Sequence, residues 1–457
     1  MSASVKVYFL ALRLPFSSFL LFLHIFIVCN ATQDFSHILS VKTTYNNSFD
    51  NNEIKIRDSS HSIIENICKP IQFNGIYRHG IRNPSKSDIN NVDAFYSRIV
   101  NAAANSGIHP SLPLPFKIET AKGLSAPGKI EMQSIQKRIA KRFDSLLSSA
   151  TADQLEFISS SISRAIGSRD AFSSAFKQFQ NHTPTSQKIS DGLMRYYYIC
   201  QKYMLPHRKP KEAKYHFDQF WSQSKIDRVA SNIRQKLGVD KLEITVVDLH
   251  AIYAYGASVM ATFGHSEWLE LFDHANLKLL EYANDLKRYW KKAYGHVMNY
   301  EQSCPLLSEI FHRMDDRING NSDKKGIFRF GHYGTLIRLL GLLGLFKDEA
   351  PLKADNYEQH TNRKFRNSRI GPFSTNLAFV LYECPPGVTP AVNSDEDVRL
   401  PPTLDRYMVQ MLFKELPERF PFCPYDLCPY NEVRNHYKRY IDHCSLQDIC
   451  SRPHDEL

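Results

Sequence analysis

The feature that most constrains the fold is an alternating apolar run at residues 71–77 that ends on the basic sequence RHGIRNP, residues 78–84. A period of two in the apolar residues predicts a strand. Two guanidiniums and an imidazole therefore stand where a strand ends and a loop begins. Since open α/β sheets bind ligands beyond the carboxyl ends of their strands, we expect an α/β fold with a site at this strand end.

The residue types of this motif predict phosphoryl chemistry. The planar forks of Arg78 and Arg82 suit the bidentate grip that a phosphate needs. His79 between them is able to attack phosphorus if it is held neutral with a lone pair free. The motif thus favours a phosphoryl-transfer site that forms a phosphohistidine, and the plain alternative is a basic surface loop.

Two further strand-to-helix transitions carry similar residues. The β-prone residues 155–162 lead to Arg164 and a following helix, and the short strand expected at 327–330 leads to His332. A helix is predicted over residues 335–343. All three transitions place a basic side chain just after a strand that leads into a helix.

These strand ends converge if the sheet is doubly wound, with helices on both of its faces. They then lie at one edge and close around one phosphate, helped by backbone amides at helix N-termini. Taken singly, Arg164 is typical of a surface salt bridge and His332 of a hydrogen-bonded core residue. Because three such transitions occur in one chain, we expect Arg82, Arg164 and His332 to share a pocket.

Both ends of the chain carry targeting patterns. Lys6 and Arg13 flank an apolar run at residues 14–28, which predicts a signal peptide over residues 1–31. An uncleaved membrane anchor is the alternative, but the run is shorter than the roughly 20 residues of a membrane span. The last residues, His454, Asp455, Glu456 and Leu457, form an ER-retention address. We expect residence in the ER lumen and an ER-retention receptor as a partner.

Cysteine usage agrees with that compartment. Without Cys29 of the leader, eight cysteines remain, an even number that suits four disulfides. Zinc is the alternative for the close pairs, but their spacings lack the C-x-x-C signature, so no metal site is predicted. Asn46 and Asn181 are glycosylation acceptors. The close pairs are Cys423/Cys428 and Cys444/Cys450, and Cys68, Cys200, Cys304 and Cys384 remain for long-range bridges in three possible arrangements.

Charge and composition narrow the class of ligand. The 457 residues are 43% hydrophobic, enough for a sizeable core, and the formal net charge is +10 at pH 7. Excess positive charge attracts nucleic acid, membranes or small polyanions. The chain has no run of five or more Lys/Arg and no RNA-binding or zinc-finger motif, so nucleic acid is not expected. A small, highly charged anionic substrate is the favoured interpretation.

The residues of the first motif carry a family resemblance. The pattern Arg78-His79-Gly80-x-Arg82-x-Pro84 resembles the nucleophile motif of the histidine phosphatase superfamily, in its acid-phosphatase and phytase branch. Within that branch the chain is similar to the multiple inositol polyphosphate phosphatases from about residue 68 to its end. The stretches that match are 280–290, 345–348, 360–365, 376–384 and 409–412, together with the tail.

The resemblance implies a role for each matched residue. It makes His79 the nucleophile and gives Arg78, Arg82 and Arg164 the task of holding the phosphoryl group. His332 would bind the same phosphate and stabilise the transition state. The family uses no metal or other cofactor, so these cations must offset the charge of the phosphoryl group. The implied substrates are inositol polyphosphates up to phytate, and 2,3-bisphosphoglycerate.

The resemblance also implies an organisation of the chain. Residues 68–179 and 315–450 would form the α/β domain, interrupted by a smaller, mostly helical domain at about 180–314. Residues 32–67, rich in Asn and Ser, are expected to form a loosely ordered lead-in. The implied disulfides are Cys68–Cys384 and Cys200–Cys304, with Cys444–Cys450 as the local C-terminal pair.

One departure from the family pattern concerns the proton donor. The family places an acidic residue two positions after its second histidine, whereas the sequence here reads His332-Tyr333-Gly334-Thr335. General acid catalysis typically contributes 10²–10⁴-fold, so its loss slows the release of an inositol alkoxide. Tyr333 is a possible substitute donor. The sequence therefore leaves two hypotheses: a phosphatase of reduced or altered activity, and a non-catalytic binder of inositol phosphates.

Overall fold

A mixed β-sheet lies at the centre of the structure, a computed structural model, and three of its strands are the predicted ones. The order of the strands is β3-β2-β4-β1-β5-β6-β7, with β8 paired to β6. β1, β4, β2 and β3 run parallel, whereas β5, β6 and β7 are antiparallel. The strands are β1 (Lys69–Arg78), β2 (Leu155–Ser159), β3 (Gln187–Ile189), β4 (Gly326–Gly331), β5 (Asn376–Glu383), β6 (Tyr407–Phe413), β7 (Leu416–Glu418) and β8 (Cys428–Pro429).

The structure describes most of the chain beyond the predicted leader. The described residues are 35–59, 63–104, 111–176, 186–200, 211–390 and 399–451, and they belong to a unit that begins at Phe35. The predicted signal peptide, Asn181 and the retention tetrapeptide at 454–457 lie outside these residues.

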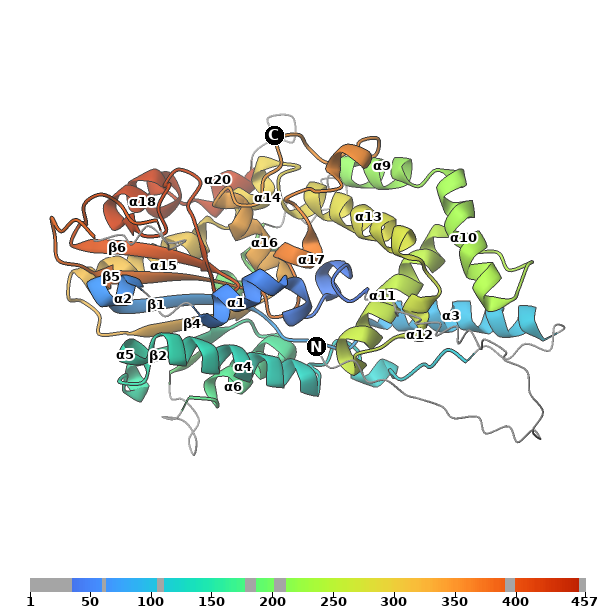
Figure 1. The fold of residues 1–457 in the computed structure, drawn as a ribbon, viewed down its shortest axis with the longest axis horizontal. Coiled ribbons are helices and arrows are strands. Elements are labelled where there is room, and N and C mark those ends of the chain that lie inside the picture. Colours follow the sequence, from blue (N-terminus) through green and yellow to red (C-terminus); the bar gives the residue numbers. More distant parts are fainter. Residues whose placement is uncertain are drawn as a thin grey trace, which may run out of the picture. The chain divides into compact units, whose positions relative to one another are not determined.

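Helices cover both faces of the sheet, as expected for the predicted α/β fold (Figure 1). Alternating side chains of β1 face opposite layers: Phe73 and Tyr77 join one core cluster and Ile76 joins the other. The first cluster packs under α4 (Ala126–Arg142), α5 (Asp144–Leu147) and α6 (Ser163–Ser173). The second packs under α15 (Cys304–Ile318), α16 (Tyr333–Leu342) and α18 (Tyr430–His436).

The region predicted as a helical insertion is largely helical. Its helices are α9 (Lys211–Phe220), α10 (Gln223–Leu237), α11 (Val246–Phe263), α12 (Glu267–Glu270), α13 (His274–Lys292) and α14 (Val297–Glu301). α3 (Lys86–Ala103) packs against α11 and so belongs to the same helical layer (Figure 1). β3 pairs with β2, so residues just after 180 contribute to the sheet. The domain boundaries themselves stay a prediction.

Two features of the structure bear on the predictions that the chain has no membrane span and no metal site. Among the described residues, α11 alone is long and apolar enough to cross a membrane, and 61% of it is buried inside the protein. A core helix of a globular protein has the same composition. The described residues contain no group of three His, Cys, Asp or Glu side chains placed to hold a metal ion.

Two of the four disulfides differ from those that the resemblance implied. Cys68–Cys384, which the resemblance implied, is confirmed, and so is Cys423–Cys428, which sequence spacing alone suggested. The pairs Cys200–Cys304 and Cys444–Cys450 are wrong, because the structure joins Cys200 to Cys450 and Cys304 to Cys444. α15 packs against α19 (Lys438–Asp442), and α14 packs against α20 (Leu446–Ser451). Because of these helix contacts, Cys444 lies next to Cys304 and Cys450 lies next to Cys200, so the two C-terminal cysteines do not pair with each other.

The lead-in before β1 is better packed than expected. Ile38, Leu39 and Tyr45 are fully buried in the core. Lys42 Nζ lies 3.0 Å from Asp88 Oδ2, 2.6 Å from the carbonyl oxygen of Ala254 and 2.9 Å from Ser258 Oγ. Buried apolar side chains spaced along this Asn- and Ser-rich segment explain why it folds onto the protein. The lead-in also contains two short helices, α1 (Asn51–Ser59) and α2 (Ile63–Ile67).

Candidate active site

The carboxyl ends of β2, β4 and β1 meet at one edge of the sheet. These strands are parallel neighbours, and Arg78 stands in register with Gly331. The backbone N–H of His79 donates to the carbonyl of Gly331 at 3.1 Å, and that of Ser160 donates to Phe330 at 3.1 Å. The strand register therefore brings His79 next to His332, which follows β4 directly.

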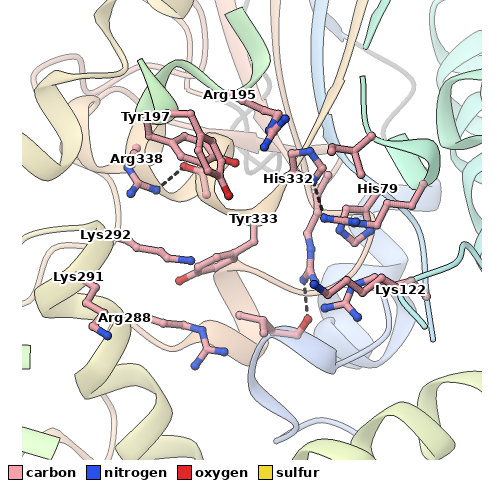
Figure 2. A pocket seen from close by; sticks show the side chains of 17 residues that line it. His79, Lys122, Arg195, Tyr197, Arg288, Lys291, Lys292, His332, Tyr333 and Arg338 are labelled. Atoms are coloured by element: carbon pink, nitrogen blue, oxygen red, sulfur yellow. Dashed lines mark hydrogen bonds between the residues drawn. The ribbon is translucent and has the colours of Figure 1, made fainter. Parts of the chain in front are cut away.

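A cavity of about 740 Å³ opens at this edge (Figure 2). Nine of its seventeen lining residues are Lys or Arg, and none of them is Asp or Glu. The five side chains predicted for the site, and Tyr333, all line it. The lining residues are Val41, Arg78, His79, Arg82, Lys122, Ile162, Arg164, Arg195, Tyr197, Tyr198, Arg288, Lys291, Lys292, His332, Tyr333, Gly334 and Arg338.

His79 is held as a neutral imidazole with one nitrogen free. Its Nδ1 lies 2.9 Å from the carbonyl oxygen of its neighbour Gly80, so Nδ1 carries the proton and Nε2 keeps its lone pair. The backbone N–H of Gly80 donates to Ser168 Oγ at 3.1 Å. Burial, followed by the charges of Arg78 and Arg164, lowers the pKa of His79 well below its usual value. The ring thus meets the requirements of a nitrogen nucleophile.

Gly80 allows the loop after β1 to approach α4 closely. A Cβ at this position would stand 2.4 Å from the carbonyl oxygen of Gly128, which is a backbone atom. Gly128 belongs to the first turn of α4, which Ser125 caps by accepting the N–H of Gly128 at 3.2 Å. The glycine therefore fixes the position of the His79 backbone.

Arg78 is fixed by carbonyl groups from two distant segments. Its Nη1 donates to Val41 at 2.5 Å and to Gly371 at 2.6 Å. The guanidinium carbon lies 4.4 Å from the ring centroid of Phe373, a cation–π distance. The lead-in thus contributes to the site, which the sequence did not indicate.

The three predicted guanidiniums are not neutralised by carboxylates. Within the described residues, Arg78, Arg82 and Arg164 have no ion pair within 4 Å. Arg82 Nη1 donates instead to the carbonyl oxygen of Asn83 at 2.6 Å. Burial, followed by the charge of Arg164, lowers the pKa of Arg82 to about 10. Buried charges of this kind require a counter-ion, and an anionic ligand supplies one.

His332 lies across the cavity floor from His79. The ring centroids are 5.6 Å apart. Arg164 Nη2 lies 3.4 Å from His332 Nδ1, and His332 Nε2 lies 2.9 Å from Ser160 Oγ. Burial, followed by the charge of Arg164, lowers the pKa of His332 to about 3. Both imidazoles are therefore neutral in the empty pocket at mildly acid pH.

Tyr333 directs its hydroxyl away from the cavity. The O–H donates to Asn367 Oδ1, and Asn367 Nδ2 donates to Asp285 Oδ1 at 2.7 Å. Burial raises the pKa of the phenol. Arg288 and Lys292 lie over its ring, at 5.8 Å and 5.2 Å from the centroid. The hydrogen bond to Asn367 engages the hydroxyl proton of Tyr333. It therefore argues against the predicted role of Tyr333 as a substitute proton donor.

Gly334 occupies a crowded position next to His332. A Cβ here would lie 3.1 Å from Arg338 Nη1 and 3.2 Å from Tyr197 Cζ. Arg338 Nη1 donates to the carbonyl oxygen of Gly334 at 3.0 Å. A side chain at residue 334 would therefore compete with the Tyr197 ring for the same space.

The outer cations of the pocket were missed by the sequence interpretation. Arg288, Lys291 and Lys292 project from the last two turns of α13, and Figure 2 shows them beside Tyr333. The basic cluster near the end of that predicted helix was the available signal. Burial, followed by the charges of Arg338 and Arg288, lowers the pKa of Lys292 to about 7. The cations crowd one another in the empty pocket.

Comparison with known proteins identifies the family. The model of the histidine phosphatase superfamily (branch 2) matches residues 71–414. The chain belongs to this family. It is thus a phosphatase of the histidine acid type, and the α/β fold with its helical layer is the one shared by the solved structures below.

Sequence relatives and solved structures that the chain is similar to carry the following names. It is 30% identical to multiple inositol polyphosphate phosphatase 1 of Gallus gallus over 403 residues, 84% of this chain and 85% of the relative. The Homo sapiens protein of the same name is 29% identical over 421 residues, 85% and 83% of the two chains. A Bifidobacterium longum multiple inositol polyphosphate phosphatase in complex with inositol hexasulfate has a TM-score of 0.67 at 16% identity, covering 90% of this chain and 99% of that one. The phytase from D. castellii has a TM-score of 0.66 at 15% identity, covering 84% and 82%.

Proposed function

We propose that this phosphatase hydrolyses inositol polyphosphates, from phytate to lower forms, through a phosphohistidine on His79. 2,3-Bisphosphoglycerate is a further candidate substrate of the same charge class. The observation that carries the proposal is a neutral, buried nucleophile at the floor of a cavity lined by nine cationic side chains and by no carboxylate. The names of the relatives support the same substrate class.

The reaction proceeds in two displacements on phosphorus. His79 Nε2 attacks the phosphoryl group, and the bond between phosphorus and the ester oxygen breaks. Arg78, Arg82 and Arg164 hold the equatorial oxygens, and His332 stabilises the charge that the transition state spreads over them. Water then attacks the phosphohistidine and releases phosphate and free His79. Because the guanidiniums supply the positive charge, the cradle itself performs the role that metal ions have in other phosphatases.

The charge of the pocket favours a substrate with several phosphates. Arg78, Arg82 and Arg164, the cradle arginines, offset the negative charge of one phosphoryl group. Six further cations line the same cavity: Lys122, Arg195, Arg288, Lys291, Lys292 and Arg338. Like charges held this close raise the free energy of the empty pocket, and additional phosphates on the substrate relieve it.

The test compares the secreted full chain with His79→Ala. We expect wild type to release phosphate from phytate and to yield a radiolabelled phosphoenzyme on quenching in alkaline denaturant, and His79→Ala to do neither while it still binds phytate. Lys214→Met, on the exposed surface of α9, serves as a matched control with wild-type turnover. Equal phosphate release by wild type and His79→Ala, on both phytate and an aryl phosphate, would contradict the proposal.

A non-catalytic binder is the second candidate, and one observation favours it. No carboxylic acid lines the cavity, and residue 334 is a glycine. Tight phytate binding by calorimetry without any turnover would select this alternative.

The cellular site is proposed to be the ER lumen. Four disulfides among the described residues fit an oxidising compartment, and Asn46 is exposed in a short 3₁₀ helix where a glycan has room. Together with the N-terminal leader pattern and the C-terminal tetrapeptide, these features support retention by an ER receptor.

A further inference from the structure

Cleavage of an alkyl phosphate leaves an alkoxide, which needs a proton as the bond to phosphorus breaks. No Asp or Glu is among the described residues that line the cavity, which leaves the other acidic groups of the pocket as candidates for the donor. The phenol groups that line it belong to Tyr197, Tyr198 and Tyr333. Two of these are poorly placed. Tyr333 donates its hydroxyl proton to Asn367, and Tyr198 is 50% exposed with its ring under Arg195 at 4.3 Å.

Tyr197 is the phenol that lies next to His332. It belongs to the short 3₁₀ helix η6 (Tyr196–Tyr198), and its Cζ, the carbon that bears the hydroxyl, lies 3.2 Å from the point where a Cβ of residue 334 would start. Gly334 is the second residue of α16, two positions after His332. Figure 2 shows the Tyr197 ring reaching into the pocket beside Arg338.

The guanidinium of Arg338 packs against the ring of Tyr197. The Arg338 guanidinium carbon lies 4.6 Å from the ring centroid. Tyr197 and Arg164 line the same cavity. Arg164 in turn contacts His332 at 3.4 Å. Tyr197 thus lies on the wall of the cavity at the side where the His332 helix begins.

We propose, on the basis of the phosphatase function above, that Tyr197 is the proton donor to the leaving alkoxide. As His79 Nε2 forms its bond to phosphorus, the electron pair of the breaking P–O bond goes to the ester oxygen, which takes the proton of the Tyr197 hydroxyl. Arg338 and Arg164 stabilise the phenolate that results. In the second step the attacking water gives its proton to this phenolate, which restores the donor.

The acidity of a phenol suffices for this transfer. Burial raises the pKa of Tyr197, and the charge of Arg338 opposes the rise. An alkoxide is a much stronger base than a phenolate, so the transfer is downhill once the P–O bond has begun to break. A raised pKa also keeps the donor protonated over the whole acid and neutral range. Alkyl-phosphate turnover therefore loses no activity to donor ionisation between pH 4 and pH 8.

The test separates leaving groups that need a donor from those that do not. The probes are glycerol 2-phosphate and 4-nitrophenyl phosphate, which carry one phosphate each and so engage the outer cations equally little. For Tyr197→Phe we expect kcat/KM on the alkyl ester to fall by about 10²-fold, the lower end of the usual contribution of a general acid. Turnover of the aryl ester should change little, which also shows that the variant is folded.

Tyr198→Phe is the matched control, since it removes a second pocket phenol from the same η6 segment. We expect it to leave the ratio of alkyl to aryl kcat/KM unchanged. If Tyr197→Phe leaves the ratio of alkyl to aryl kcat/KM unchanged, the assignment is overturned. It is also overturned if Tyr198→Phe or Lys292→Met, and not Tyr197→Phe, selectively loses activity on the alkyl ester. Those results leave the proposed function intact, because wild type still turns over both esters. Wild type at the level of His79→Ala on both esters would overturn both proposals.

A rescue variant tests the position itself. Tyr197→Ala combined with Gly334→Glu removes the ring that crowds residue 334 and supplies a carboxylic acid in the same space. We expect this pair of changes to restore alkyl-ester turnover relative to Tyr197→Ala. We also expect a new loss of activity as pH rises above the pKa of the carboxyl group. No gain on the alkyl ester, with aryl turnover intact, would contradict the placement.

Discussion

At the scale of single residues, the site places two buried imidazoles next to the positive charges of arginine side chains. His79 and His332 are both buried beside guanidiniums, and their pKa values fall for the same two reasons, burial first and the neighbouring arginines second. An anionic ligand reverses the second effect, because a nearby negative charge favours the protonated imidazole. His79 therefore meets its ligand with the Nε2 lone pair free for attack, and His332 is able to gain positive charge beside the bound phosphate.

The depressed pKa of His332 predicts how stability depends on pH. The unfolded chain takes up a proton at His332 near pH 6.5, whereas the folded protein does so only near pH 3. Stability from this residue is therefore fully present above pH 6.5 and is lost as pH falls toward 3. We expect wild type to lose about 3 kcal/mol more than His332→Gln between pH 6.5 and pH 4 in urea unfolding without phosphate.

The control for this experiment is His265→Gln, at a side chain that is 71% exposed. Its replacement should leave the pH dependence of unfolding as in wild type. Parallel pH curves for wild type and His332→Gln would show that the imidazole is not buried neutral.

At the scale of secondary-structure elements, the three predicted strand-to-helix transitions are present, although the strand expected over residues 155–162 ends at Ser159 and its helix begins already at Ser163. β1 ends at Arg78, β4 ends at Gly331 just before His332, and Arg164 is the second residue of α6. The alternation of apolar residues and the helix start signals were sufficient to predict these transitions, since both depend only on residues that are neighbours in the sequence. The lead-in was misjudged because its few buried side chains lie in polar surroundings. Its value to the fold comes from contacts with β1, α3 and α11, far away along the chain.

Lys42 connects this lead-in to the helical layer, which gives a prediction at the element scale. Its Nζ reaches Asp88 in the first turn of α3, where Asp88 also completes the capping box with Ser85. Its neighbour Val41 supplies a carbonyl to Arg78. We expect Lys42→Met to destabilise the protein by about 2 kcal/mol, between the cost of breaking a surface ion pair and that of breaking a buried one, because the pair is partly buried. KM for phytate should also rise, because Arg78 loses a fixed acceptor.

The control is the exposed pair of Lys214 and Asp218, four residues apart on α9, with Lys214 81% exposed. Lys214→Met should change the free energy of unfolding by less than about 0.5 kcal/mol. A loss of stability in Lys42→Met that is no larger than in Lys214→Met would show that the lead-in is not pinned at this residue.

At the scale of the whole molecule, disulfides join distant parts of the chain. Cys304–Cys444 spans 140 residues, whereas Cys423–Cys428 spans 5. Counting cysteines identified four bridges, but their partners depend on which helices pack together. The C-terminal helices α19 and α20 lie against α15 and α14, and sequence spacing carries no information about that contact.

The difference in loop length predicts a difference in stability. In the chain-entropy account, closing the longer loop stabilises the folded state by about 3 kcal/mol more than closing the shorter one. We expect the double variant Cys304→Ala/Cys444→Ala to lose about that much more stability in urea unfolding than Cys423→Ala/Cys428→Ala. Peptide mapping of the oxidised protein checks the pairing directly. Recovery of a Cys200–Cys304 peptide would contradict the fold described above.

The sequence by itself determined the basic motif at residues 78–84, the strand that carries it and the cysteine inventory. Each of these depends on residues close together in the chain, where period and spacing express backbone geometry. The tertiary structure alone decided which cations surround the cradle, which cysteines pair, and that Tyr197 fills the space beside Gly334. Two of these contacts, the Cys200–Cys450 bridge and the contact of Tyr197 with residue 334, join segments more than a hundred residues apart. They follow from how apolar faces of helices pack, and no local pattern records that.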